Sequence, residues 1–193
     1  MTEFLKMHGL GNDFIVLDAR ESANRIPDVI SKAAATALAD RHFGVGCDQI
    51  LVIRPSHRAD IFLQILNSDG SASAACGNGT RCVAHLLSKE NNKKEINLTV
   101  ASKVLKSKIF ENNLVETSIG SPKIKWDEIP LSKNSDTKNL NIKLIDNENN
   151  EFIGGIAVNV GNPHVIFFIE NIDKFNLKKI GPEIENHELF PEK

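Results

Sequence analysis

The 193-residue sequence lacks the features that mark several specialised classes of protein. Neither sign of charge dominates, since 23 Lys and Arg against 25 Asp and Glu leave a net charge of -2 and no basic field for nucleic acid. No apolar run approaches the roughly 20 residues of a membrane-spanning helix, and the opening MTEFLKMHG has no signal-peptide core. We therefore expect neither a nucleic-acid nor a membrane partner.

Cysteine and the common cofactor motifs are scarce as well. Cys47, Cys76 and Cys82 are odd in number and follow no framework spacing, which indicates free thiols in a reducing cytoplasm rather than a disulfide scaffold. His42 and His85 with Cys82 match no zinc-ligand spacing, so no metal site is expected. The GLGND and GVGCD segments lack the strand–GxGxxG–helix layout and the lysine of a phosphate-binding loop, which argues against a nucleotide.

What is present, 41% hydrophobic and 25% charged residues, suits a globular chain of one large or two small domains. Apolar patterning predicts strands in both halves and helices mainly in the first half. The predicted strands span residues 4–7, 13–18, 49–53, 60–66, 97–110, 114–119, 156–160 and 165–169. The predicted helices run over residues 27–44, from Thr80 into the polar stretch 88–94, and over a short part of 172–193.

Two segments of the second half concern domain organisation. Gly120-Ser121-Pro122 is typical of a domain boundary, so we expect an N-terminal domain over residues 1–119 and a C-terminal domain over residues 120–193. Residues 134–150 are rich in Asn, Lys and Asp, which predicts a solvated loop with weak internal structure.

The segment NSDGSASAACGNGTRCVAHLL, residues 67–87, is the most informative part of the sequence. Cys76 stands at a glycine-rich turn that opens a predicted helix, where the helix dipole and free N–H groups favour a thiolate. The N–H groups of Gly77 and Asn78 would face an anion bound there. A buried structural cysteine followed by a glycine turn is an equal alternative on spacing alone. Cys82 lies on the apolar stripe of the helix, which favours core packing.

An internal echo links the two halves of the chain. LGNDFIVLD, residues 10–18, and VGNPHVIFF, residues 160–168, share Gly-Asn followed by an apolar strand. If the halves are pseudo-repeats, the counterpart of Cys76 falls beyond Lys193, so one half of the site would be missing from this chain. A match this short also arises by chance and gains weight only from further blocks.

Five blocks, two of which overlap the echoed segments, carry a resemblance to a known family. They are MHGLGNDFIVLD, ADRHFGVGCDQILVI, NSDGSASAACGNGTRC, GNPHVIFF and GPEIENHELFP, which occur in the family's order and cover nearly the whole chain. On these blocks the chain resembles the N-terminal part of the diaminopimelate epimerases, which are cofactor-independent isomerases. Proline racemase-like relatives carry Cys-Gly-His where this chain has Cys76-Gly77-Asn78, which favours the epimerases.

The resemblance implies an α+β fold of two pseudo-symmetric domains, each a barrel-like sheet around a central helix, with the second incomplete here. It also implies epimerisation of LL-2,6-diaminopimelate to the meso isomer in lysine biosynthesis, with two cysteines that remove and return the α-proton. No cofactor and no metal are implied. The expected partners are the small amino-acid substrate and a second copy of the chain in a homodimer.

The resemblance also assigns residues. Cys76 matches the first catalytic cysteine, and His164 matches a histidine that tunes the pKa of the cysteines. The matched substrate-contacting positions are Asn12, Gln49, Asn67, Gly77, Asn78 and Asn162. From the residues alone, Asn12 and Asn162 equally suit turn caps. Gln49 equally suits a polar edge-strand position, and His164 a satisfied core or surface histidine.

The chain departs from the family in its second half. The second Cys-Gly-Thr-Gly segment is absent, and neither Cys47 nor Cys82 lies in a matching context. We therefore expect a C-terminally truncated member that lacks the second cysteine. Two other functions stay open: a non-catalytic remnant that binds an amino acid or a partner chain, and a related racemase of another amino acid.

Overall fold

The computed structural model describes residues 3–21 and 26–192, and the chain divides into two compact units. Unit 1 is Met1–Ile119 and unit 2 is Gly120–Lys193. Among the described residues, the buried apolar side chains of unit 1 form two clusters and those of unit 2 form a third. Because each unit has its own core, each is a folding body that can be considered by itself.

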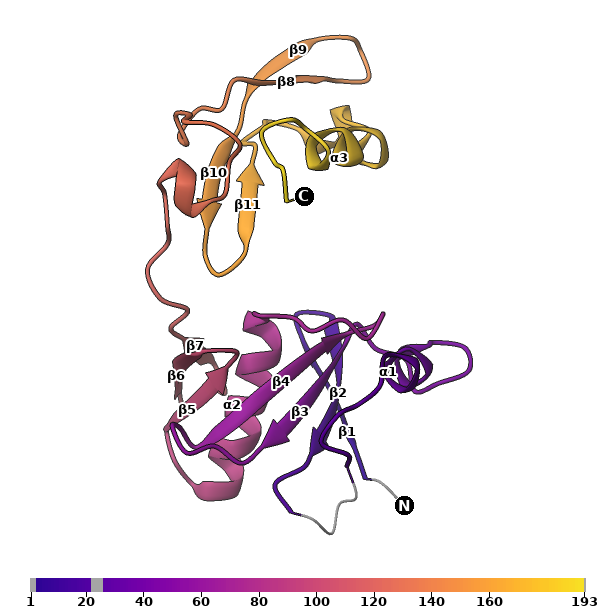
Figure 1. Ribbon diagram of the computed structural model, residues 1–193, viewed down its shortest axis with the longest axis vertical. Helices are drawn as coiled ribbons and strands as arrows, with labels where there is room; N and C mark the ends of the chain where they lie inside the picture. Colours follow the sequence, from indigo (N-terminus) through magenta and orange to yellow (C-terminus); the bar gives the residue numbers. More distant parts are fainter. Residues whose placement is uncertain (1–2, 22–25, 193) are drawn as a thin grey trace. The chain divides into compact units, whose positions relative to one another are not determined.

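Unit 1 is built on a seven-stranded sheet whose strands follow one another in chain order (Figure 1). Its strands are β1 (Leu5–Gly9), β2 (Asn12–Asp18), β3 (Gln49–Arg54), β4 (Ile61–Asn67), β5 (Glu95–Val100), β6 (Lys103–Ile109) and β7 (Val115–Thr117). Strand β2 pairs parallel to β3, and β4 pairs parallel to β5; the other neighbours are antiparallel. Each parallel pair needs a crossover, and helices α1 (Lys32–Ala39) and α2 (Gly77–Asn91) supply the two.

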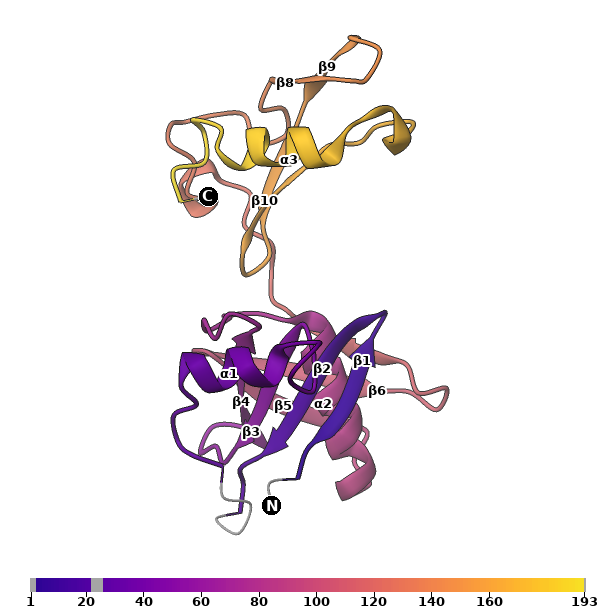
Figure 2. The same ribbon diagram turned by 90° about the vertical axis from the view of Figure 1, so that its right-hand side faces the viewer.

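The central strands are buried on both faces, which explains their nearly continuous apolar sequences. In β2, Phe14 and Val16 belong to the cluster that includes the apolar side of α2. The alternate residues Ile15 and Leu17 belong to the cluster that includes Ala35 of α1. Because side chains alternate across a strand, α1 and α2 cover opposite faces of these strands (Figure 2).

Helix α2 is the axis around which the sheet of unit 1 curls. It contacts β1 and β2 at one end of the sheet and β5, β6 and β7 at the other. A sheet whose two ends reach the same helix must bend around it. The buried stripe of α2 includes Val83 and Leu87, with exposed fractions of 0% and 1%. The predicted α+β fold with a sheet around a central helix is confirmed.

Helix α1 is shorter at both ends than the sequence predicts. Its start is set by Ser31, whose hydroxyl accepts a hydrogen bond from the backbone N–H of Ala34 (3.2 Å). Its end is set by Asp40, whose carboxylate accepts hydrogen bonds from the backbone N–H groups of His42 and Phe43 (2.7 Å each). Local side-chain capping therefore overrides the longer alanine-rich pattern.

Unit 2 has a looser arrangement of small elements. Two separate hairpins pair β8 (Ile142–Ile145) with β9 (Glu151–Gly154) and β10 (Ile156–Asn159) with β11 (Pro163–Ile166). The short 3-10 segments η2 (Trp126–Glu128) and η3 (Ile172–Lys174) and helix α3 (Leu177–Glu185) complete the unit. Phe152 packs edge-on against Phe167 and Phe175, with ring centroids 6.4 Å apart in both pairs.

The predicted solvated loop over residues 134–150 is wrong for its central part, which forms β8. Leu140, Ile142 and Leu144 are only 7%, 3% and 5% exposed and belong to the core of unit 2. They stand at every second position, which is the signal of a strand with one buried face. The surrounding Asn and Lys residues hide this alternation in the overall composition.

Candidate functional site

Three predicted substrate-contacting amides of unit 1 lie at one end of the sheet. Asn12 begins β2, Gln49 begins β3, and Asn67 ends β4 directly opposite Gln49 in the register. A two-residue turn, Leu10 and Gly11 with φ of 55° and 87°, leads the chain from β1 into Asn12. Strand pairing alone therefore brings these amides together at one end of the strands. From this end the polypeptide continues into α2.

Cys76 is the residue that caps the N-terminus of α2. Its backbone is extended, and its Sγ accepts a hydrogen bond from the backbone N–H of Gly79 (3.3 Å). Its carbonyl oxygen accepts hydrogen bonds from the backbone N–H of Thr80 (2.9 Å) and from the Thr80 hydroxyl (2.8 Å). These bonds let the helix begin at Gly77, three residues before the apolar periodicity starts. The position of Cys76 at the opening of a helix is confirmed.

The protonation of the Cys76 thiol differs from the expectation of a thiolate. Burial raises the pKa of Cys76, while hydrogen bonds from the N–H groups of Gly79 and Asn78 and the charge of Arg81 act in the opposite direction. The N–H groups at the helix start are in place, but removing the sulfur from water has the larger effect. Burial therefore favours the thiol form over the thiolate at this helix start.

Two predicted substrate-contacting amides meet beside this thiol. The Oδ1 atom of Asn12 lies 3.8 Å from Cys76 Sγ, within reach of a weak S–H hydrogen bond. The same oxygen accepts a hydrogen bond from Nδ2 of Asn78 (3.4 Å). Asn78 in turn accepts a hydrogen bond from the guanidinium of Arg81, three residues further along α2. The thiol is thus bordered by polar groups that have defined partners.

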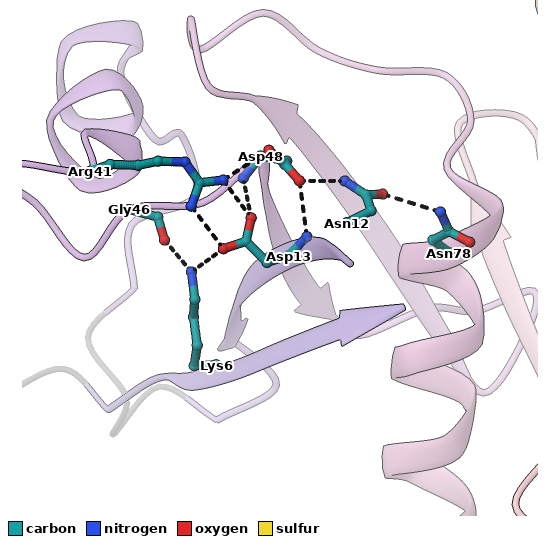
Figure 3. A network of polar contacts seen from close by, with 7 residues as sticks. All are labelled: Lys6, Asn12, Asp13, Arg41, Gly46, Asp48 and Asn78. Atoms are coloured by element: carbon teal, nitrogen blue, oxygen red, sulfur yellow. Dashed lines mark hydrogen bonds and ion pairs between the residues drawn. The ribbon is translucent and has the colours of Figure 1, made fainter. Parts of the chain in front are cut away.

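An ion-pair cluster beyond Asn12 was not assigned a role from the sequence. Asp48 Oδ2 accepts hydrogen bonds from Asn12 Nδ2 (2.9 Å) and from the backbone N–H of Asp13 (3.0 Å). Arg41 bonds both Asp13 (2.7 Å) and Asp48 (2.9 Å), and Lys6 pairs with Asp13 (2.9 Å) (Figure 3). These partners hold the pKa of both carboxyl groups below the usual range. The sequence signal for this cluster was the position of Asp13 in one family block and of Arg41 and Asp48 in another.

Gln49 and Asn67 bond to each other across β3 and β4. Gln49 Nε2 donates to Asn67 Oδ1 (2.9 Å), and Asn67 Nδ2 donates to the hydroxyl of Ser71 (3.0 Å). Strand β3 lies inside the sheet, so the alternative of Gln49 as an edge-strand residue is wrong. Gly77 is the first residue of α2, which places its backbone N–H at the helix start beside Cys76.

The remaining two predicted residues belong to unit 2. Asn162 lies in the turn between β10 and β11, and His164 lies on β11 opposite Val158. His164 Nε2 is 3.1 Å from Asn162 Oδ1, and both residues are exposed. His164 also lines a cavity of about 150 Å³ together with apolar side chains that include Ile184 and Phe190. The structure thus groups Asn162 with His164, Cys76 with Asn12 and Asn78, and Gln49 with Asn67.

The described residues also include two other cysteines but neither a cluster of metal ligands nor a membrane-spanning helix. Cys47 and Cys82 are 2% and 8% exposed, and burial raises the pKa of both. Over residues 3–21 and 26–192, no group of three or more His, Cys, Asp or Glu side chains is placed to hold a metal ion. Over the same residues, no helix combines the length and apolarity that crossing a bilayer requires.

Comparison with known sequences adds a family to this geometry. The family model described as "Diaminopimelate epimerase" matches residues 4–125. A diaminopimelate epimerase of Pelagibacter ubique is 58% identical over 189 residues, which cover 97% of this chain and 67% of that protein. The diaminopimelate epimerase of Acidiphilium cryptum is 44% identical, and the match covers 98% of this chain and 65% of that protein. The one of Carboxydothermus hydrogenoformans is 38% identical, and the match covers 99% of this chain and 69% of that protein. The chain spans about two thirds of the length of these relatives.

Solved structures with little sequence identity share the fold. A hydroxyproline epimerase from Agrobacterium vitis is 14% identical with a TM-score of 0.55, covering 92% of this chain and 52% of that one. A phenazine biosynthesis protein of the PhzF family from Bacillus anthracis is 15% identical with a TM-score of 0.54, covering 88% and 55%. At these identities the likeness concerns the fold alone.

Proposed function

Because this chain belongs to the diaminopimelate epimerase family, we propose that it serves the epimerisation of LL-2,6-diaminopimelate to the meso isomer, a step of lysine biosynthesis. One observation carries the proposal: Cys76 Sγ lies at the start of α2, bordered by the amides of Asn12 and Asn78. A proton-transfer thiol needs such neighbours, because the α-carboxylate gains negative charge as the α-proton leaves.

In the proposed reaction Cys76 acts on one face of the α-carbon. As a thiolate it takes the α-proton, and the electron pair of the broken C–H bond spreads onto the substrate carboxylate. As a thiol it returns a proton to the carbanion on the same face. Burial favours the thiol form, and the N–H groups of Gly79 and Asn78 with the charge of Arg81 stabilise the thiolate form. The surroundings of Cys76 therefore contain groups that stabilise the thiol and groups that stabilise the thiolate.

The substrate contacts are proposals of the same kind. The N–H groups of Gly77 and Asn78 would bind the α-carboxylate, and the side chains of Asn12 and Asn67 would bind the ammonium and carboxylate groups. Gln49 would bind a distal polar group of the substrate. We further propose that Asn162 contacts substrate and that His164 tunes the thiol pKa.

Inversion needs a second proton donor on the opposite face of the carbon. Cys47 and Cys82 are buried, so neither is suited to this role. We therefore expect that these 193 residues alone exchange the α-proton without inverting the carbon. A homodimer and a cytoplasmic location remain part of the proposal for the protein in the cell.

The test is incubation of the chain with LL-diaminopimelate in heavy water. The expected result is deuterium at the α-carbon without meso product, abolished by Cys76→Ser and retained in Cys82→Ser, a matched control in the same helix. Deuteration that persists in Cys76→Ser would contradict the role of Cys76. Formation of the meso isomer by this chain would contradict the need for a further thiol.

A second candidate function is binding without catalysis, favoured by the raised pKa of the half-buried Cys76 thiol, whose desolvation disfavours the thiolate. It predicts saturable binding of diaminopimelate by calorimetry with no α-deuteration and little effect of Cys76→Ser. The two functions therefore give opposite results in the same heavy-water experiment.

A further inference from the structure

A chain of hydrogen bonds with fixed ends runs past Cys76. Arg81 donates to Oδ1 of Asn78, and Nδ2 of Asn78 donates to Oδ1 of Asn12 (3.4 Å). Nδ2 of Asn12 then donates to Oδ2 of Asp48 (2.9 Å), as Figure 3 shows for the part from Asn78 to Asp48. The chain thus joins the first turns of α2 to the start of β2 and the residue before β3.

The residues at the two ends fix the direction of donation along this row of hydrogen bonds. A guanidinium only donates hydrogen bonds and a carboxylate only accepts them, whereas a side-chain amide can turn over and exchange its oxygen with its nitrogen. With Arg81 at one end and Asp48 at the other, only one orientation of each amide satisfies every bond. In that orientation the oxygen of Asn12, and not its NH₂ group, faces Cys76 Sγ at 3.8 Å.

We propose that Asp48 is a positioning residue for proton transfer at Cys76: its carboxylate fixes the Asn12 amide so that the acceptor oxygen faces the thiol. This inference rests on the proposed role of Cys76 as the proton-transfer group. The carboxylate of Asp48 is itself fixed, because Arg41 bonds its Oδ1 atom (2.9 Å) and the backbone N–H of Asp13 bonds its Oδ2 atom (3.0 Å).

The contribution of this cluster is positional more than stabilising. The side chains of Arg41 and Asp48 are 55% and 44% exposed, and exposed ion pairs contribute only about 0–1 kcal/mol. The orientation of the Asn12 amide instead affects the protonation of the Cys76 sulfur. An amide oxygen can accept from the S–H group and favours the thiol, whereas an amide N–H would favour the thiolate. Asp48 thereby sets which form of Cys76 its neighbour supports.

Two titrating or charged groups of α2 act electrostatically on the Cys76 thiol. Arg81 and Cys82 on α2 interact with it directly, Arg81 by favouring the thiolate and Cys82 as a second buried thiol. On the side of β2, the amide of Asn12 separates the sulfur from the charged cluster. That cluster consists of Asp48, Asp13, Arg41 and Lys6.

The test measures the rate of Cys76 alkylation by iodoacetamide against pH on the whole chain, with the modified residue identified by mass spectrometry. Asp48→Asn keeps the shape of the side chain but removes the charged acceptor of the Asn12 Nδ2 bond (2.9 Å). The Asn12 amide can then turn its NH₂ group to the sulfur by giving up only the longer bond from Asn78 (3.4 Å). We expect the midpoint of the pH profile to fall by about one pH unit. Asp60→Asn removes a carboxylate of unit 1 that bonds Lys93 and Asn97, and should leave the midpoint unchanged.

Removing the negative charge at position 48 would also lower the midpoint if that charge acted directly on the thiol through space. A double-substitution cycle separates this charge effect from the effect of turning the Asn12 amide. In an Asn12→Ala background no amide is left to turn, so Asp48→Asn should cause no further fall. An equal fall in both backgrounds, or no fall in either, would overturn the proposal.

The measurement remains decisive if Asp48→Asn loses its circular dichroism signal. Asn12→Ala alone must then lower the midpoint, because the thiol loses its acceptor, and an unchanged midpoint would overturn the inference. Alkylation needs no substrate. A failure of positioning by Asp48 is therefore distinguishable from a failure of the proposed epimerase function, which only the heavy-water exchange reports.

Discussion

Unit 1 and unit 2 differ in how firmly they hold the residues proposed for function. Unit 1 has a continuous sheet with helices on both faces, and it contains all of the largest fully buried side chains among the described residues. Unit 2 has two separate hairpins and a smaller core. Cys76 and Asn12 in unit 1 are half-buried, whereas Asn162 and His164 in unit 2 are exposed on a hairpin.

The difference teaches where positional accuracy comes from in this chain. In unit 1, strand register places Gln49 opposite Asn67, and a capped helix start places Cys76 beside Asn12. Side chains held by a packed sheet lose few alternative positions when a ligand binds. In unit 2 the exposed side chains of Asn162 and His164 bond to each other. Substitutions in the two cores should therefore have distinct effects.

The largest effect is expected from Leu51→Ala in unit 1. Leu51 is fully buried between the sheet and α2, and deleting its side chain should lower the free energy of unfolding by about 2–5 kcal/mol. Urea unfolding followed by far-ultraviolet circular dichroism would measure the loss. The matched change Leu144→Ala in unit 2 should instead shift the fluorescence of Trp126, the single tryptophan, which lies against that core. A shift of both signals by either substitution would contradict separate cores.

A smaller effect is expected from Gly79→Ala. An added Cβ would lie 3.0 Å and 3.1 Å from the two methyl carbons of Leu51 and 3.3 Å from Cys76 Sγ. The crowding should cost about 1–3 kcal/mol of unfolding free energy and displace the sulfur that caps α2. Thermal melting and the alkylation rate of Cys76 would report the two consequences. A variant with unchanged melting temperature and unchanged thiol reactivity would show that the helix start can shift freely.

Acid should weaken unit 1 more than unit 2. Hydrogen bonds and ion pairs from Arg41 and Lys6 lower the pKa of Asp13, so its stabilising contribution is complete above the unfolded pKa near 4. That contribution is lost progressively as the pH falls below 4 towards the lower folded pKa. Asp13→Asn should cost about 1–2 kcal/mol at pH 7 and flatten this dependence. The urea unfolding midpoints of both proteins at pH 7 and pH 3 would check this prediction. If Asp13→Asn lost as much stability between pH 7 and pH 3 as the unsubstituted chain, the acid sensitivity would come from other groups.

The smallest effect, of opposite sign, is expected from Gly181→Ala in α3 of unit 2. Apart from its chain neighbours and the backbone of its own helix, a Cβ at this position meets no atom within 4 Å. Alanine favours a helix over glycine by about 1 kcal/mol, and the following Pro182 limits this gain. The substitution should raise the stability of unit 2, measured by Trp126 fluorescence in urea. Destabilisation would mean that α3 needs a glycine for a reason other than space.

Much of unit 1 follows from local sequence signals. The strands over residues 13–18 and 49–53 are apolar at consecutive positions because both faces are covered, and their prediction is confirmed. The opening of a helix at Cys76 follows from the glycines and the apolar stripe after it. The family was predictable because five ordered blocks carry it, and its match over residues 4–125 confirms the prediction.

Other features depend on contacts that no local pattern encodes. The bonds of Asn12 to Asp48 and of Arg41 to Asp13 join residues far apart in the sequence, and any Asp or Arg on a loop looks like a solvated charge. The raised pKa of Cys76 depends on how far the fold removes its sulfur from water, an effect that outweighs the N–H groups of the helix start. The assignments of the site residues themselves stay predictions until substrate is bound.

The strand order of unit 1 has a consequence for how the chain acquires its structure. Each strand pairs with its immediate predecessor and successor in the chain, so no pairing waits for a segment from the far end of the sheet. The antiparallel pairs close over short connections, which carry a small entropic barrier, and the two parallel pairs close once α1 and α2 have formed between them. The sheet of unit 1 can therefore grow strand by strand as the polypeptide leaves the ribosome. The start of α2 with Cys76 can therefore form before unit 2 has been synthesised.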